Sequence, residues 1–296
     1  ASLPVTADTK FRVASLSKVA TALGAMLLVE QGKLQLDRDI SAYLGFPLRN
    51  PHYPDRPITA RMLLSHTSSL RDGGLYMLSP PYTLRDFFEP SGAYYADGTH
   101  FAAPQSGADY SPGRYFTYAN LNYGVLATAM EAVSGERFDQ YMQRHLFEPL
   151  GIEGGYTLDS LSFADLAEVA TLYTKQNPQG VWDADGPWYP QYDDVSGAPP
   201  PAPMAAPRLA PAPVSAQPPP SNPLAGYRIG TNATMFAPYA GLRISARDLA
   251  KLLLLFLDGG RYDGRQIIAP ATLQRMLREQ WHFDAQRPNG DTQAGS

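Results

Sequence analysis

The sequence predicts an α+β chain in which helices dominate over strands. Three long apolar segments have helical spacing and are followed by glycine-containing stops, at residues 17–31, 121–133 and 245–258. The strand-like segments, 10–13 and 239–244, are short. With 296 residues, 44% of them hydrophobic and 18% charged, the chain can bury the core of one large domain or two modest ones.

The composition excludes several classes of function. The formal net charge is −4, and Lys and Arg are scattered, so no basic surface for nucleic acid is expected. The absence of cysteine excludes disulfides, thiolate metal sites and a cysteine nucleophile, and it fits a periplasmic or a cytoplasmic protein. The longest apolar run, 249–257, contains Lys251 and is far shorter than the roughly 20 residues of a membrane span. We therefore expect no nucleic-acid partner and no membrane span.

The first long helix begins with a pattern typical of an activated serine. A strand at 10–13 gives way to the helix at 17–31, whose apolar residues cover most of its circumference and predict burial. Ser15 lies at this junction, and Lys18 follows one helical turn later, so the Lys18 ammonium can reach the Ser15 hydroxyl. Ser15 is therefore a candidate nucleophile. The alternative is a structural serine that only caps the helix.

The next part of the chain is predicted to consist mainly of loops. His66 follows a short helix, where a histidine is more often a structural hydrogen-bonding residue than a catalytic one. Residues 71–113 are rich in Gly, Pro, Tyr and Asp, a composition typical of loops that line a substrate cleft. Asp97 and Asp109 lie in these loops, but nothing in the pattern separates them from solvated acids.

A second motif, with Tyr118 and Asn120 two residues apart, precedes the helix at 121–133. A phenol beside the Lys18 cation has its ionised form favoured, so Tyr118 can take the proton of Ser15. Asn120 can hold a substrate carbonyl or amide, and it is also a suitable N-cap for the helix. Each motif occurs once and each precedes a long apolar helix. Together they indicate nucleophilic acyl transfer.

The remaining elements are shorter helices and one insertion. Helices are expected at 60–65, capped by Thr59, at 138–146, and from Pro270 to about residue 280; Ser245 is expected to cap the helix that follows it. Residues 198–223 contain 11 of the chain's 28 prolines, which favours polyproline-like structure and excludes a packed element. We interpret this segment as a surface insertion.

The order of these motifs resembles that of the penicillin-recognising serine hydrolases, within the branch of class C β-lactamases, β-lactamase-fold esterases and D-amino-acid peptidases. Five segments that span nearly the whole chain carry the resemblance: Asp8–Lys18, Leu63–Ser68, Pro112–Asn120, Phe147–Gly151 and Ala240–Ala250. Five segments in the right order are far more specific than either short motif alone.

The resemblance implies an antiparallel sheet with flanking helices plus a mostly helical domain, with the Ser15 helix between them. It implies that Ser15 is the acylated nucleophile and Lys18 its activating neighbour, with the Ser15 N–H as one half of the oxyanion hole. Tyr118 would be the general base and later the acid, and Asn120 would orient the substrate. No metal or organic cofactor is implied. The expected partner is a small ester, amide or β-lactam, and the expected location is periplasmic or secreted, with the cytoplasm as the alternative.

One motif of this family is missing. None of the 5 Lys and 5 His residues has Gly two residues later, so the Lys/His-x-Gly strand that supplies the second oxyanion N–H is absent. We expect residues 1–14 to be a remnant of the sheet domain and residues 15–296 to form the mostly helical domain of a truncated chain. An intact mass of 32.3 kDa for the active species would contradict this. If the chain ends at Ser296, we expect weak or no catalysis, because one lost oxyanion donor costs about 10²–10³ in kcat.

Several functions remain open from the sequence. An esterase- or peptidase-like serine hydrolase is favoured, because the long loops and the proline-rich insertion differ from a compact β-lactamase. The alternatives are a β-lactamase proper, a non-catalytic penicillin-binding-like protein of the same fold, and an interaction module that uses the proline-rich segment.

Overall fold

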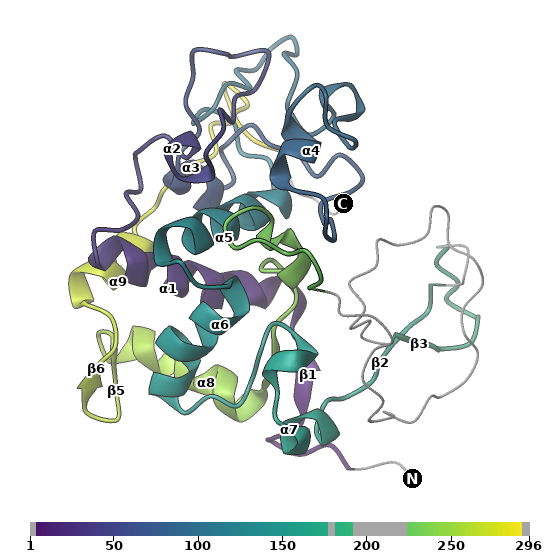
Figure 1. The fold of residues 1–296 in the computed structure, drawn as a ribbon, viewed down its shortest axis with the longest axis vertical. Helices are drawn as coiled ribbons and strands as arrows, with labels where there is room; N and C mark the ends of the chain where they lie inside the picture. Colours follow the sequence, from purple (N-terminus) through teal and green to yellow (C-terminus); the bar gives the residue numbers. More distant parts are fainter. Residues whose placement is uncertain (1–3, 177–180, 192–223, 292–296) are drawn as a thin grey trace.

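The computed structural model describes residues 4–176, 181–191 and 224–291, and their fold is mostly helical with short strands, as predicted (Figure 1). The α-helices are α1 (Ser17–Glu30), α2 (Ser41–Leu44), α3 (Ala60–Leu64), α4 (Leu84–Phe88), α5 (Leu121–Ser134), α6 (Phe138–Met142), α7 (Phe163–Ala167), α8 (Ala246–Leu257) and α9 (Pro270–Leu277). Single turns of 3-10 helix occur at Ala14–Leu16, Ala96–Gly98, Glu148–Leu150, Leu158–Ser160 and Ala233–Phe236, and a π turn at Gln143–Phe147. The proline-rich segment 198–223 lies outside the described residues.

The strands of the described residues form three two-stranded antiparallel sheets. The pairs are β1 (Lys10–Arg12) with β4 (Arg243–Ser245), β2 (Leu172–Thr174) with β3 (Tyr189–Gln191), and β5 (Arg261–Tyr262) with β6 (Arg265–Gln266). In the first pair Lys10 lies opposite Ser245, so residues from both ends of the chain meet just before α1. The described part of the chain therefore has an α+β fold that lacks most of the sheet.

Helices α1 and α5 form the centre of the core. Both cross the middle of Figure 1, and α5 packs against α1, α3 and α6. Leu23 and Leu28 of α1, and Leu126 and Met130 of α5, are at most 1% exposed. Burial on most faces explains why both sequences are apolar around the helix rather than along one stripe. The core thus fixes the beginnings of the two helices that carry the predicted motifs.

Two predicted helices end earlier than expected. Helix α6 ends at Met142, and the chain continues as the π turn and a 3-10 turn, where Pro149 has no N–H to extend the α-helical pattern. Helix α9 ends at Leu277, because the chain becomes extended at the next residue. It then runs to Asn289, whose carbonyl accepts from the Phe116 N–H at 2.8 Å. The C-terminal segment thereby reaches the segment that leads to Tyr118.

Glu131 of α5 attaches the segment after the insertion to that helix. Its side chain is fully buried, and one carboxylate oxygen accepts from the Phe138 N–H at 2.8 Å. The other oxygen accepts from the Tyr227 hydroxyl at 2.6 Å and the Gly230 N–H at 2.8 Å. Burial raises the pKa of Glu131 to about 7, although these three hydrogen bonds lower it. Ionisation of this carboxyl is therefore costly to the folded chain.

The substitution Glu131→Gln should reduce the pH dependence of stability. The folded pKa of about 7 lies above the ordinary value of 4.5, so between these pH values the folded chain keeps a proton that the unfolded chain has lost. The wild-type free energy of unfolding therefore falls as pH rises through this window, by on the order of 3 kcal/mol, and it levels off above the folded pKa. The glutamine variant has no such contribution.

Urea denaturation at a series of pH values from 5 to 8 measures this difference. The stability of the wild type relative to the variant should decrease as pH rises, on top of a constant offset from the lost Phe138 acceptor. Parallel curves would contradict the prediction. Glu89→Gln, at a partly exposed acid paired with Arg85, is the control and should keep the wild-type slope.

Candidate active site

Ser15 lies on a tight turn between β1 and α1. Ala14 has a positive φ of 47°, and Ala14–Leu16 form one turn of 3-10 helix before α1 begins at Ser17. The predicted junction is therefore correct, but the serine precedes the α-helix instead of belonging to its first turn. The Ser15 side chain is exposed, so a small molecule can reach its hydroxyl.

The beginning of α1 is fixed by the segment that leads into β4. The Ser17 hydroxyl accepts from the Leu242 N–H at 3.0 Å, and the Thr21 hydroxyl donates to the Pro238 carbonyl at 2.6 Å. Lys18, between them, donates to the Tyr239 carbonyl at 3.0 Å. Three side chains of the first turns thus bond to one short stretch of backbone, which leaves the Lys18 ammonium little freedom.

Lys18 connects all the residues that the sequence places in the site. Its Nζ lies 3.2 Å from Ser15 Oγ, 2.6 Å from Tyr118 Oη and 2.9 Å from Asn120 Oδ1. Ser15 Oγ and Tyr118 Oη are themselves 2.7 Å apart. The structure therefore brings together the four predicted side chains, from two segments about 100 residues apart, around one buried ammonium group.

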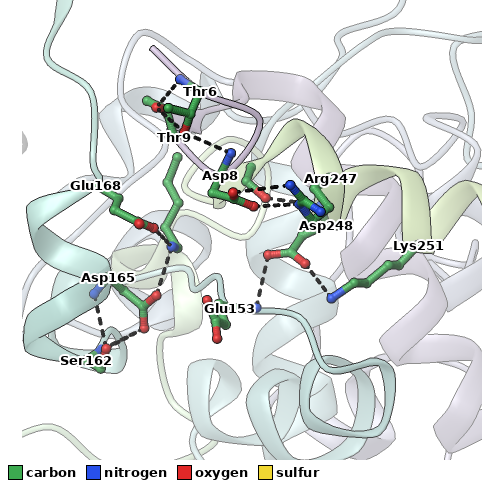
Figure 2. Close-up of polar contacts among 12 residues, drawn as sticks. Thr6, Asp8, Thr9, Glu153, Ser162, Asp165, Glu168, Arg247, Asp248 and Lys251 are labelled. Atoms are coloured by element: carbon green, nitrogen blue, oxygen red, sulfur yellow. Dashed lines mark hydrogen bonds and ion pairs between the residues drawn. The ribbon is translucent and has the colours of Figure 1, made fainter. Parts of the chain in front are cut away.

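The electrostatic surroundings of Lys18 differ from those of Lys10, the other fully buried lysine near the start of the chain. Lys10 is 1% exposed and forms ion pairs with Asp165 and Glu168, each at 2.8 Å. Figure 2 labels these two acids. Burial lowers the pKa of Lys10, but its hydrogen bonds to these two carboxylates and their negative charges raise it by more, so the net shift is upward. Lys18 is 6% exposed, and burial lowers its pKa in spite of its contacts with Tyr118 and the charge of Asp72. Lys10 is thus a structural cation, whereas Lys18 is suited to exchange a proton.

Tyr118 projects from the segment that precedes α5. Its ring packs on His66 with 4.6 Å between ring centroids, and it remains 41% exposed. The Tyr118 hydroxyl lies 2.7 Å from Ser15 Oγ and 2.6 Å from Lys18 Nζ. Tyr118 is thus accessible to a substrate that reaches Ser15.

His66 has a structural position. It is 9% exposed, and its Nδ1 accepts from the Ala119 N–H at 3.3 Å and lies 3.1 Å from the Asn122 side-chain nitrogen. Burial, together with the nearby Lys18 charge, lowers the pKa of His66 to about 4. The imidazole is therefore neutral near pH 7, and it packs on the Tyr118 ring and accepts from the Ala119 backbone.

The prediction that the Asn120 side chain caps α5 is wrong. Asn120 occupies the N-cap position, but its side chain makes no capping hydrogen bond. Its Oδ1 accepts from Lys18, and its Nδ2 donates to Asp72 Oδ2 at 2.9 Å. The cap comes from Asp72, whose Oδ1 accepts from the Leu121 N–H at 2.9 Å. The Asn120 side chain is thereby available to the site.

Asp72 is the acid that the sequence pattern does not indicate. Of the loop acids considered, Asp109 accepts from the Ser111 N–H within its own turn, and Asp97 is exposed; neither contacts the four site residues. Asp72 lies in the same loops and is half-buried. Its one sequence signal is its place four residues after the segment Leu63–Ser68, and that signal is weak.

Lys18 also lines an apolar cavity of about 480 Å3. It is lined by Val19 and Met26 of α1, by residues of α3 and α9, and by Phe116 and Trp281, but not by Ser15, Tyr118 or Asn120. The cavity thus shares Lys18 with the group around Ser15 but does not include Ser15. Within the described ranges, no group of three or more His, Asp or Glu side chains is placed to hold a metal ion.

Comparison with known proteins identifies the family. The family model described as Beta-lactamase matches residues 1–294. The chain belongs to the β-lactamase family. The resemblance seen in the order of motifs is thereby confirmed. Across the described part of this β-lactamase-family chain, no helix has the length and apolarity needed to cross a membrane.

Relatives in the β-lactamase family include penicillin-binding proteins and a peptidase. Penicillin-binding protein 4 of Amycolatopsis lactamdurans is 30% identical over 189 residues, which cover 60% of this chain and 45% of that protein. The D-alanyl-D-alanine-carboxypeptidase/endopeptidase AmpH of Escherichia coli (strain K12) is 32% identical over 149 residues, which cover 49% of this chain and 36% of that protein. The chain spans less than half the length of these relatives.

Solved structures agree with the assignment of the fold. A penicillin-binding protein from Bacillus halodurans superposes with a TM-score of 0.58 at 21% identity, covering 95% of this chain and 67% of that one. EstCE1, described as a hydrolase with promiscuous acyltransferase activity, superposes with a TM-score of 0.56 at 24% identity, covering 91% and 63%. The chain therefore has the β-lactamase/transpeptidase-like fold.

Proposed function

We propose that this β-lactamase-family chain is a serine hydrolase that forms an acyl-enzyme on Ser15. The observation that carries the proposal is the position of Lys18 Nζ, within hydrogen-bonding distance of both Ser15 Oγ and Tyr118 Oη, which are themselves 2.7 Å apart. An ammonium group beside a phenol stabilises the phenolate, which can then accept the serine proton.

In the proposed reaction, Ser15 Oγ attacks the substrate carbonyl while its proton passes to Tyr118 Oη. Lys18 stabilises the negative charge on the phenol oxygen before this transfer, and Asn120 orients the substrate. When the tetrahedral intermediate collapses, the proton on Tyr118 passes to the leaving alcohol or amine. A water molecule then releases the acyl group by the same steps in reverse, with Tyr118 again as the base.

The proposed substrates are small esters, amides or β-lactams, with esterase- or peptidase-like activity favoured. The relatives support this range, because one is named a carboxypeptidase/endopeptidase and a structural neighbour is described as a hydrolase with acyltransferase activity. No resident cofactor or metal enters the proposal. On family resemblance we also propose a periplasmic or secreted location, with the cytoplasm as the alternative.

The test is to incubate the full chain with a fluorophosphonate and with a fluorescent penicillin, and to locate the adducts by mass spectrometry. We expect both probes to modify Ser15 and neither to modify the Ser15→Ala variant. Fast loss of the penicillin adduct would identify a β-lactamase, and a permanent adduct without ester hydrolysis would identify a penicillin-binding-like protein. No adduct on Ser15 from the full chain would overturn the proposal.

A further inference from the structure

The amide of Asn120 lies between two partners of opposite hydrogen-bonding character. On one side is the Lys18 ammonium, which can only donate, and on the other is the Asp72 carboxylate, which can only accept when ionised. An amide in this position has one favourable orientation, with Oδ1 towards Lys18 and Nδ2 towards Asp72. The reversed orientation would place two donors together at Lys18 and two acceptors together at Asp72.

Asp72 also removes the competing use for the Asn120 side chain. An asparagine at an N-cap usually turns its oxygen to the backbone N–H groups of the first helical turn. Here Asp72 Oδ1 already accepts from the first N–H of α5, that of Leu121, while Oδ2 holds the Asn120 amide. Both carboxylate oxygens are therefore used, one for the helix end and one for the site residue.

We propose that Asp72 is a positioning residue, which rests on the proposed function: it fixes the orientation of the Asn120 amide so that its oxygen holds the Lys18 ammonium against Ser15 and Tyr118. Asp72 touches neither Ser15 nor Tyr118, so it acts through Asn120. One N–H of the Asn120 amide is used by Asp72, and the second stays available for a substrate carbonyl.

The substitution Asp72→Asn tests this, because it keeps the shape of the side chain and reverses its character towards Asn120. The new amide can still accept from the Leu121 N–H, but it then presents a donor to the donor of Asn120. We expect the second-order rate constant for phosphonylation of Ser15 by a fluorophosphonate to fall about 10- to 100-fold, the size of effect expected from misplacing a reacting group. Asp86→Asn makes the same change at the start of α4, where Asp86 accepts from the Thr83 N–H, and should leave the rate unchanged.

A reciprocal exchange distinguishes positioning from a merely structural role. In the double variant Asp72→Asn, Asn120→Asp, the carboxylate at position 120 accepts from Lys18 and from the new amide at position 72, and every donor again meets an acceptor. The fluorophosphonate reports activation of Ser15 and not the grip on a substrate amide. We therefore expect the double variant to react at least about 10-fold faster than either single variant.

The outcomes separate this inference from the proposed function. If the wild type does not react at Ser15, the proposed function fails. If the wild type reacts but Asp72→Asn reacts equally fast, or the double variant is no faster than the single ones, the role of Asp72 is overturned and the hydrolase stands. Should Asp72→Asn not fold, the comparison of Asn120→Asp with the double variant makes the same decision.

Discussion

Replacement of Lys18 by methionine should lower the rate of Ser15 acylation by at least about 10⁴-fold, the range found when a central member of a catalytic group is removed. Methionine keeps the apolar stem, which is buried in α1, and removes the ammonium that contacts Ser15, Tyr118 and Asn120. The measurement is the rate of phosphonylation by a fluorophosphonate, followed by intact mass. The free energy of unfolding should change little. The buried Lys18 ammonium has no carboxylate of the described residues in contact with it, so its removal also removes the cost of burying that charge.

Lys10→Met is the matched control for this prediction. Lys10 is equally inaccessible, but its loss leaves Asp165 and Glu168 without their cation (Figure 2). We therefore expect a lower melting temperature and a wild-type acylation rate for the folded protein, the reverse of Lys18→Met. Equal acylation rates for Lys18→Met and the wild type would refute the role of Lys18. Equal losses of stability and of rate in Lys18→Met and Lys10→Met would mean that both lysines are structural.

The position of the candidate nucleophile could be predicted because the pattern is local. Ser15 and Lys18 are three residues apart at the start of an apolar helix, and helical geometry alone brings them together. Tyr118 and Asn120 also form a local pattern, two residues apart directly before α5. That the two motifs meet could be inferred only from the resemblance to a family, since their separation of about 100 residues leaves no periodic signal.

The roles of Asp72 and of Lys10 could not be predicted, because they depend on contacts distant in sequence. Asparagine is a common N-cap residue, so the sequence favours a capping role for Asn120. Asp72, from another loop, instead caps the helix and binds the Asn120 amide. Lys10 and Lys18 are both buried lysines near the start of the chain. The carboxylates that distinguish Lys10 come from α7 and the residue after it, more than 150 residues later.

Replacement of Tyr118 by phenylalanine should lower the rate of ester hydrolysis by about 10²–10⁴-fold, the usual contribution of general acid–base catalysis. Phenylalanine keeps the ring packing on His66 and removes the hydroxyl that lies 2.7 Å from Ser15 Oγ and 2.6 Å from Lys18 Nζ. The loss should depend on the leaving group. A p-nitrophenolate leaves without a proton, whereas a methoxide needs one, so the methyl ester of butyric acid should lose more rate than its p-nitrophenyl ester.

The two esters share one acyl group and differ only in the leaving group. Comparing them therefore tests both proposed roles of Tyr118, which are to accept the Ser15 proton and to protonate the leaving group. Tyr123→Phe is the matched control: its hydroxyl donates to the Leu64 carbonyl at 3.5 Å, and its removal should leave both rates near those of the wild type. Equal losses for the two esters in Tyr118→Phe would restrict Tyr118 to accepting the serine proton. Unchanged rates for both esters would indicate that Lys18, and not Tyr118, accepts the Ser15 proton. Lys18 lies near Ser15 Oγ, and its lowered pKa favours the neutral amine that this needs.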